Sequence, residues 1–252
     1  MHKFIFSALV ATLISTSLYS QKQQIDSADR INYFSADFAY HIPQYDMSKW
    51  FYNSATIGAT YCIKTSSNWT FGLDVNYLWG DQIKNKDSVL KNITNSDGNI
   101  IDGNGQYAII NYTESGWTGT FTVGKVFPLT KKNQNSGLWI KGGIGFLQHK
   151  ILITNPKNVA PQIKDDYKKG YDQLANGLSC SQFIGYLWIS KRSAVNAYAG
   201  FEIIEGWTKS RRTTDFNTGL PDKSQKFDVL TGFKIGVIIP IYKRRPEAFY
   251  VN

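Results

Sequence analysis

The stretch WTFGLDVNYLWG, residues 69–80, alternates between two kinds of side chain. Every odd position holds an apolar or aromatic residue, and the even positions are small or polar apart from Leu78. Because successive side chains of a β-strand point to opposite faces, a period of two predicts a strand with two unlike faces. A fold built from such strands must bury one whole apolar face or cover it with lipid.

The same alternation recurs through the chain. The eight predicted strands cover about residues 34–42, 51–63, 69–80, 117–127, 138–149, 178–190, 195–203 and 227–239. Residues 178–190 are apolar on both sides, so the pattern does not assign their faces. Each strand has the length that a tilted strand needs to cross a membrane. Aromatic residues make up 15% of the 252 residues and charged residues 19%, which suits β structure and excludes a disordered chain.

Residues 1–20 predict a signal peptide that is cleaved from the mature chain, 21–252. They combine a short basic start, an apolar run and small residues before Gln21. We expect cleavage after Ser20, with Ser17 as an alternative. No other run of 18 apolar residues occurs, so the mature chain can cross a membrane only as a barrel.

The polar face of the strands distinguishes a soluble barrel from a membrane barrel. A solvated exterior would carry Lys, Glu and Gln, whereas this face is mostly Gly, Thr, Ser and Asn. Small residues suit the interior of a narrow barrel, and Trp and Tyr near the strand ends suit the two interfacial belts. Short connections alternate with long ones, as outer-membrane barrels require. The sequence therefore predicts an all-β fold, an eight-stranded antiparallel transmembrane barrel in the outer membrane.

The last strand carries a further signal. Its segment KIGVIIPI, residues 234–241, resembles the C-terminal signal read by the barrel-assembly machinery, although it lacks a terminal aromatic residue. The mature chain resembles the OmpA/OmpX-like class of eight-stranded barrels. The segments GGIGFLQHKI, DDYKKGYDQLANGL and PIYKRRPEAFY are similar to those of small outer-membrane proteins of Bacteroidota type. The resemblance implies outer-membrane lipid and the assembly machinery as partners, and it implies no biochemical activity.

Charged residues interrupt the polar face in the middle of the strands. They are Asp37, Asp74, Lys141, Glu202, Asp228 and Lys234. Side chains fill the interior of an eight-stranded barrel, where an unpaired ion is costly. The pattern therefore favours a buried network of ion pairs that plugs the lumen over its alternative, a path for protons or ions.

Two histidines and two cysteines are the remaining candidates for chemistry. His41 and His149 are expected near the outer ends of their strands. They leave open a lipid A or phospholipid-modifying enzyme with residues at the barrel rim, although the His-x-Ser spacing of the deacylase type is absent. We predict no cofactor and no metal site, because two histidines without an acidic or Cys cluster are a poor ligand set. Cys62 and Cys180 fall at opposite ends of a band ~25 Å tall, too far apart for a disulfide, and should be free thiols.

Surface residues at both ends of the barrel are candidates for partner binding. The chain has a net charge of +9, and basic residues gather in the short turns and in the tail that follows Pro240, where the last strand is expected to end. Residues Ile163, Tyr167 and Tyr171 recur at the spacing of one face of a short helix. The candidate partner-binding residues are Tyr167, Tyr171, Lys243, Arg244, Arg245, Phe249 and Tyr250. Contact with anionic headgroups and packing of the loop on itself are the alternatives.

The predicted function is that of a non-enzymatic outer-membrane barrel. We expect it to be a structural or partner-binding component of the cell envelope, with a secretion or assembly complex as one setting. A periplasmic or envelope protein is the expected partner, and no nucleic acid is expected for an exported barrel.

Overall fold

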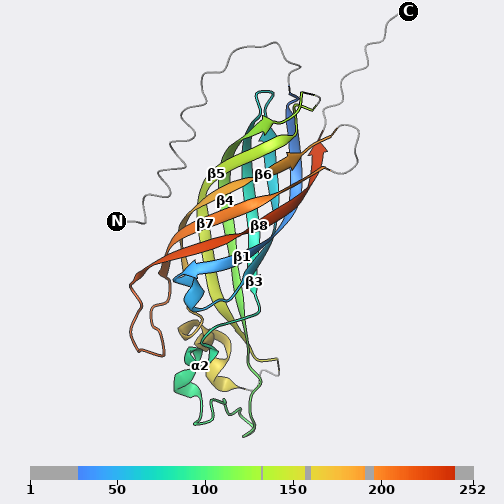
Figure 1. Ribbon diagram of the computed structural model, residues 1–252. Coiled ribbons are helices and arrows are strands. Elements are labelled where there is room, and N and C mark those ends of the chain that lie inside the picture. Colours follow the sequence, from blue (N-terminus) through green and yellow to red (C-terminus); the bar gives the residue numbers. More distant parts are fainter. Residues whose placement is uncertain (1–27, 132, 157–159, 191–195, 242–252) are drawn as a thin grey trace, which may run out of the picture.

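Eight antiparallel strands close into a single barrel in which each strand pairs with its neighbours in the sequence and β8 pairs with β1 (Figure 1). A computed structural model describes residues 28–131, 133–156, 160–190 and 196–241. The predicted signal peptide and the predicted tail lie outside these residues. The strands are β1 (Ile31–Tyr45), β2 (Ser54–Lys64), β3 (Trp69–Gly80), β4 (Asn111–Pro128), β5 (Gly137–Thr154), β6 (Ala175–Trp188), β7 (Asn196–Ser210) and β8 (Gln225–Ile241).

The prediction of an eight-stranded antiparallel barrel is thus confirmed, with differences at the strand ends. β4 and β5 run further than expected, to Asn111 and Thr154, and form a hairpin that projects from the barrel. The expectation that Pro240 ends the last strand is wrong, because Pro240 pairs with Tyr33 and β8 ends at Ile241. A proline so close to the strand end forfeits at most one terminal ladder hydrogen bond, which the barrel tolerates.

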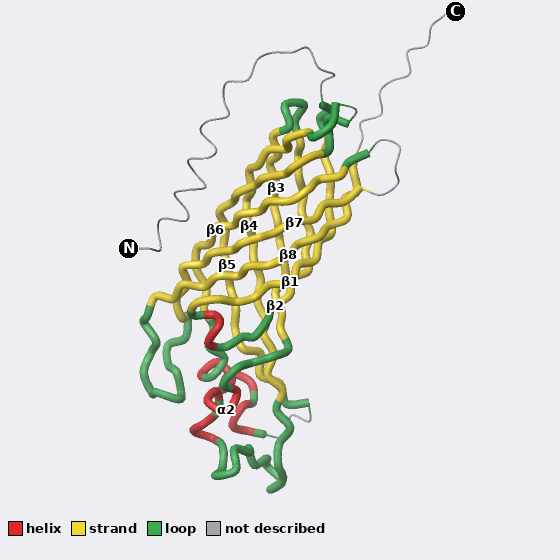
Figure 2. Tube along the Cα trace, viewed as in Figure 1, coloured by secondary structure: helices red, strands yellow, loops and turns green. Residues whose placement is uncertain are grey.

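The register fixes how the strands tilt. One circuit of the ring through paired residues starts at Asn32 and returns to β1 at Ile42, ten residues further along. The circuit passes through Ile63, Phe71, Val123, Gly142, Gln182, Ile203 and Thr231. For eight strands, a stagger of this size corresponds to a tilt of roughly 40° and an interior that side chains can fill. The strands in Figure 2 show this slant.

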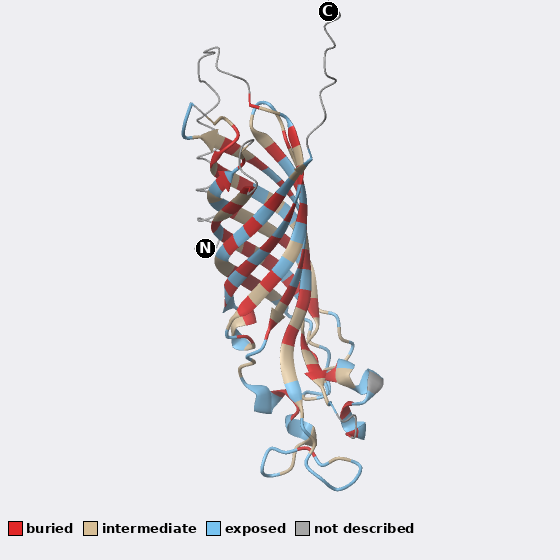
Figure 3. Cartoon of the chain, turned by 90° about the vertical axis from the view of Figure 1, so that its right-hand side faces the viewer, coloured by how far each residue is buried: buried red, intermediate tan, exposed pale blue. Residues whose placement is uncertain are grey.

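The two faces of the wall differ as the alternation predicts. Buried and exposed residues form a chequered pattern along the strands (Figure 3). The middle of the outer face is apolar, with exposed side chains such as Phe38, Leu73, Phe121, Phe201 and Ile235 from strands all around the ring. An apolar belt that encircles a protein is unfavourable in water and favourable in lipid, so the outer face faces a bilayer.

Aromatic residues flank this belt at both ends. At one end they are Tyr77, Trp79, Trp117 and Trp207, and at the other they are Trp69, Phe127, Tyr186 and Trp188. Strand β6, whose faces the sequence left unassigned, turns Ser179, Phe183 and Leu187 inward and Ile184, Tyr186 and Trp188 outward.

Short helices gather beyond one end of the barrel, which we call the loop end (Figures 1 and 2). They are α2 (Lys86–Val89) and the 3₁₀ helices η2 (Met47–Lys49), η3 (Lys91–Ile93), η4 (Pro161–Ile163) and η5 (Asp165–Gly170). The other end, which we call the turn end, carries the short connections that follow β2, β4 and β6. No helix in the described part of the chain is long and apolar enough to cross a membrane.

Candidate functional site: the barrel interior and its cap

Lys234 lies at the centre of a buried ion network in the barrel interior. Its ammonium group is 3.2 Å from Asp37 Oδ1 on β1 and 3.2 Å from Glu202 Oε1 on β7. β8 pairs with both of these strands, so the register brings the three side chains together. Thr60 Oγ1 donates a hydrogen bond of 3.2 Å to Asp37 Oδ2. All three ionic side chains are at most 5% exposed, so the charges compensate one another in place of water.

Lys141 forms the second ion pair of the interior. Its Nζ lies 3.0 Å from Asp74 Oδ2. Three aromatic rings surround the same ammonium group, with centroids 4.7 Å (Trp139), 5.4 Å (Phe183) and 5.8 Å (Tyr198) away. An ammonium group is attracted to ring faces at such distances, and the attraction is larger where water is excluded. These aromatic residues therefore both fill the lumen and hold a cation there.

The two histidines lie near the loop ends of their strands, as expected, because His41 pairs with the first residue of β2 and His149 with the first residue of β6. Both are nevertheless buried inside the barrel and are not exposed at its rim. His41 is fully buried, and its Nε2 lies 3.2 Å from Thr56 Oγ1 and 3.9 Å from Glu202 Oε2. His149 is 4% exposed, and its Nε2 lies 2.9 Å from Asp228 Oδ2. Both face inward because each occupies an inward position of its strand. In the described residues, neither imidazole hydrogen-bonds a serine.

Thus the six predicted lumen charges lie inside the barrel but not in one network. Lys234 brings Asp37 and Glu202 together, Lys141 pairs with Asp74, and Asp228 lies nearer the loop end with His149. Thr208 Oγ1 donates a hydrogen bond of 2.5 Å to Asp228 Oδ2.

Sequence reasoning missed two charges that the described residues bury inside the barrel. Glu114 is 1% exposed and accepts a hydrogen bond of 2.5 Å from Ser54 Oγ. It was missed because residues 81–113 read as a loop and the next strand was expected to begin only at Trp117. Glu114 lies an even number of positions before Thr118 and Thr120. Since those two were assigned to the inner face, Glu114 would also have been placed there if the strand had been extended. Lys64, expected in an exposed turn, is buried at the turn end, where its Nζ donates to Asn135 Oδ1 at 3.0 Å.

Apolar layers close the lumen on both sides of the central charges. Toward the loop end, the four side chains of one layer are at most 3% exposed; they are Leu78, Leu147, Ile204 and Leu230. Toward the turn end, a second cluster contains Ile31, Tyr33, Cys62, Val126, Trp139, Phe183, Leu187, Ile189, Tyr198 and Ile238. The two clusters therefore lie in the lumen on either side of the central charges, and the interior of an eight-stranded barrel is only wide enough for side chains to fill it.

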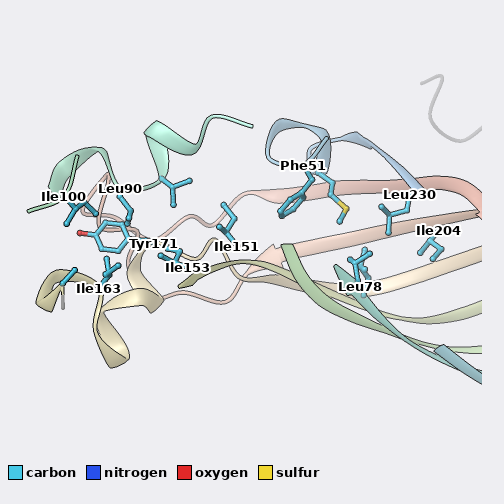
Figure 4. Close-up of a cluster of buried hydrophobic side chains, with 14 residues drawn as sticks. Phe51, Leu78, Leu90, Ile100, Ile151, Ile153, Ile163, Tyr171, Ile204 and Leu230 are labelled. Carbon is cyan, nitrogen blue, oxygen red and sulfur yellow. The ribbon is translucent and has the colours of Figure 1, made fainter. Parts of the chain in front are cut away.

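The loops at the loop end form a folded cap over the barrel. Its core extends the layer beneath it and includes Phe51, Leu90, Ile151, Ile163 and Tyr171. In Figure 4, Leu90, Ile163 and Tyr171 lie together, and Ile151 and Phe51 lie between them and the layer that contains Leu78 and Leu230. Polar contacts join the loops at the surface of this core. Arg212 forms a two-point ion pair with Asp172, with its Nε 2.7 Å from Oδ1. Asn217 Nδ2 donates to the carbonyl oxygen of Val89 at 2.9 Å.

The cap decides which predicted partner-binding residues are accessible. Tyr167 is 62% exposed, whereas Tyr171 is 5% exposed and packs edge-on against Phe216 at 5.2 Å between ring centroids. The expected helical face is corrected, because η4 and η5 are separate 3₁₀ segments that bury Ile163 and Tyr171 in the cap core. The loop therefore packs on its neighbours, and of the three residues of the expected helical face Tyr167 alone is exposed. The tail residues Lys243, Arg244, Arg245, Phe249 and Tyr250 lie outside the described residues.

The cysteines and potential metal ligands complete the inventory of reactive groups. Cys62 is buried on the inner face, Cys180 lies half-buried on the outer face, and both are free thiols, as predicted. Among the described residues, no group of three or more His, Cys, Asp or Glu side chains is arranged to hold a metal ion.

Comparison with known proteins gives only distant likenesses. No protein-family model and no curated protein matches the chain. Ail, the attachment invasion locus protein of Yersinia pestis, is 7% identical with a TM-score of 0.45, over 84% of this chain and 99% of that one. Neisserial surface protein A is 9% identical with a TM-score of 0.40, over 82% and 96%. OprG from Pseudomonas aeruginosa is 11% identical with a TM-score of 0.38, over 86% and 99%. Likenesses this weak carry no conclusion about function or partners.

Proposed function

We propose that this chain is a non-enzymatic outer-membrane barrel, a structural or partner-binding component of the cell envelope whose lumen is closed. The observation that carries the proposal is the filled interior, where paired charges lie between two apolar layers under a folded cap. Because such a barrel has no open channel, it acts through the surfaces that it presents to other molecules.

The orientation follows from the lengths of the connections. Outer-membrane barrels have short periplasmic turns and long outer loops. The turn end therefore faces the periplasm and the capped loop end faces outward. The predicted signal peptide supports export, and the apolar outer belt supports insertion as a barrel. In this orientation the cap is the part of the protein that meets other cells, molecules or envelope components.

Partner binding is favoured because the cap folds around its own core and exposes aromatic side chains at its surface. A loop that needed only to be soluble would not fold around its own hydrophobic core. The cap nevertheless exposes Tyr107 (63%) and Tyr167 (62%), and exposed aromatic residues on a fixed backbone are frequent anchors of protein contacts. At the periplasmic side, the basic and aromatic residues of the tail remain the candidates for an acidic envelope partner.

An enzyme receives little support from the interior. A lipid-modifying enzyme needs its base within reach of a lipid at the rim, but His41 and His149 are both buried and already contact carboxylates or a threonine inside the barrel.

Three measurements test the proposal. Fractionation and heat-modifiable migration should place a folded barrel in the outer membrane, and recovery as a soluble periplasmic protein would refute that placement. Lipid A mass spectra of cells with and without the gene should be identical. A defined acyl or phosphate change that depends on either histidine would instead establish an enzyme.

Purification in mild detergent should retain a partner protein, and deletion of residues 247–252 should weaken a periplasmic complex without affecting barrel folding.

A further inference from the structure

A polar cleft of about 790 Å³ lies beside the cap, apart from the barrel interior. Residues Asp81–Asp87, which follow β3, form one side of it, and residues 110–113, at the start of β4, form the other. Tyr52, from the connection between β1 and β2, closes one edge. Lys84 and Asn85 hydrogen-bond the carbonyl oxygens of Ser48 and Lys49 in the neighbouring loop. The interior network described above does not include the polar side chains of this cleft.

The height of the cleft relative to the membrane follows from the strand pattern. Asp81 continues the outward row of β3 one position beyond Trp79. Thr113 likewise continues the outward row of β4 beyond Ser115 and Trp117. Trp79 stacks on Tyr77 of the aromatic belt, with ring centroids 6.3 Å apart. The cleft therefore opens on the outer wall directly above the belt, at the level of the headgroups of the outer leaflet.

Two kinds of surface line the cleft. Its back is apolar, and Ile83, Ile110 and Tyr112 pack there against the cap core, which holds the back in place. Its front is polar and exposed. In the described part of the chain, the side chains of Lys86, Asp87 and Asn111 make no hydrogen bond or ion pair, so all three are available to a ligand.

The lining identifies the chemistry of the ligand. Asp81 and Asp87 balance Lys84 and Lys86, so the cleft does not select strongly for either sign of charge. Carboxylates and amides accept hydrogen bonds from hydroxyl groups, and ammonium groups donate to them. Lys84 Nζ lies 4.8 Å from the centroid of the Tyr52 ring, and the Tyr52 side chain, still 57% exposed, offers its remaining aromatic surface to the apolar face of a sugar ring. Such a mixture of hydrogen-bonding groups around a partly apolar wall matches a saccharide better than a peptide or a simple anion.

We propose that this cleft binds the saccharide headgroup of a glycolipid in the outer leaflet. The lipid chains of the ligand lie against the apolar belt below while its sugars enter the cleft above. The inference rests on the proposed outer-membrane orientation, because only that orientation places the cleft at the outer headgroups. A membrane-anchored ligand next to the cleft also has a high effective concentration, which strengthens binding by individually weak sugar contacts.

The test uses the full mature chain, refolded in nonionic detergent and titrated with rough-type lipopolysaccharide, whose sugars form a short core. Native mass spectrometry counts the bound glycolipid. The variant D87A/N111A removes two lining groups, and D97A/N104A makes the same two changes at exposed positions of the same loop outside the cleft. We expect D87A/N111A to bind at least about tenfold more weakly than the wild type and D97A/N104A to bind equally well.

A D87A/N111A variant that binds as the wild type does, or a wild type that retains no lipopolysaccharide, would overturn the inference. Heat-modifiable migration checks that each variant folds, and N111A replaces the double variant if the latter does not. The delipidated core oligosaccharide should bind more weakly than the intact glycolipid. If the oligosaccharide and the intact glycolipid bind with equal affinity, the cleft binds a soluble saccharide, and the proposal that its ligand is anchored in the membrane is overturned. Loss of glycolipid binding by a barrel that still fractionates with the outer membrane would leave the proposed function standing.

Discussion

Replacing Lys234 by methionine tests whether the interior network stabilises the closed barrel. The substitution keeps most of the side-chain volume but removes the cation between Asp37 and Glu202, each 3.2 Å from its Nζ. Breaking a buried ion pair by removing one partner costs about 3–5 kcal/mol, because the other charge is left buried. Here Asp37 keeps its bond from Thr60, and Glu202 can turn to His41 at 3.9 Å. The cost should therefore fall at the lower end, about 3 kcal/mol.

The assay is denaturant unfolding of the refolded barrel in detergent, followed by tryptophan fluorescence and by heat-modifiable migration. The matched rescue is the triple variant D37N/E202Q/K234M, which removes the two carboxylate charges along with the ammonium group. Replacing a whole buried ion pair by hydrophobic residues of similar volume is often close to neutral, but the buried amides of the triple variant need hydrogen-bond partners of their own. The triple variant should therefore be more stable than K234M by about 1 kcal/mol or more and remain somewhat less stable than the wild type. A loss below about 1 kcal/mol for K234M, or a triple variant no more stable than K234M, would refute the reasoning.

Three further predictions address the packing, the cap and the seal. G236V should lose about 1–3 kcal/mol of unfolding free energy, because a Cβ at this position would collide with the ring of Tyr198 in the lumen. G142V should be tolerated, because its Cβ would face outward, 3.8 Å from the nearest atom. R212A should speed protease cleavage of the cap loops severalfold and leave heat-modifiable migration unchanged, since it removes only the ion pair between two loops. In a C180S background, the Cys62 thiol should react with a water-soluble methanethiosulfonate only after the barrel is unfolded, because it is buried in the apolar cluster at the turn end. Labelling of the folded barrel as fast as that of the unfolded chain would show that water reaches this cluster.

The barrel wall could be predicted from the sequence because its physics is local. A period of two records which face each residue occupies, and Trp69–Gly80 was delimited as the structure has it. In β6 neither face is distinctly polar, so the same reasoning did not show which residues point inward. Only the register around the closed ring resolved them.

The cap and the pairing of the lumen charges could not be predicted in the same way. The cap is held by contacts such as that between Asn217 and Val89, which lie 128 residues apart in the sequence. The sequence of either loop alone therefore does not predict that the loops pack together. Asn- and Lys-rich loops read as solvated connections, although their scattered Ile, Leu and Tyr side chains form a core. The histidines were assigned to the correct face and to the correct end of their strands. Their burial was not foreseen, because it depends on the cap and on neighbouring strands that a single strand does not reveal.

The central claim, that the barrel is closed, is tested most directly by its conductance. Purified, refolded protein inserted into planar lipid bilayers should show no stable single-channel currents, because paired charges, two apolar layers and the cap fill the path. Heat-modifiable migration of the same sample shows that folded barrels were added, and co-sedimentation with vesicles shows that they insert. Large, stable and reproducible single-channel currents from that sample would contradict the claim.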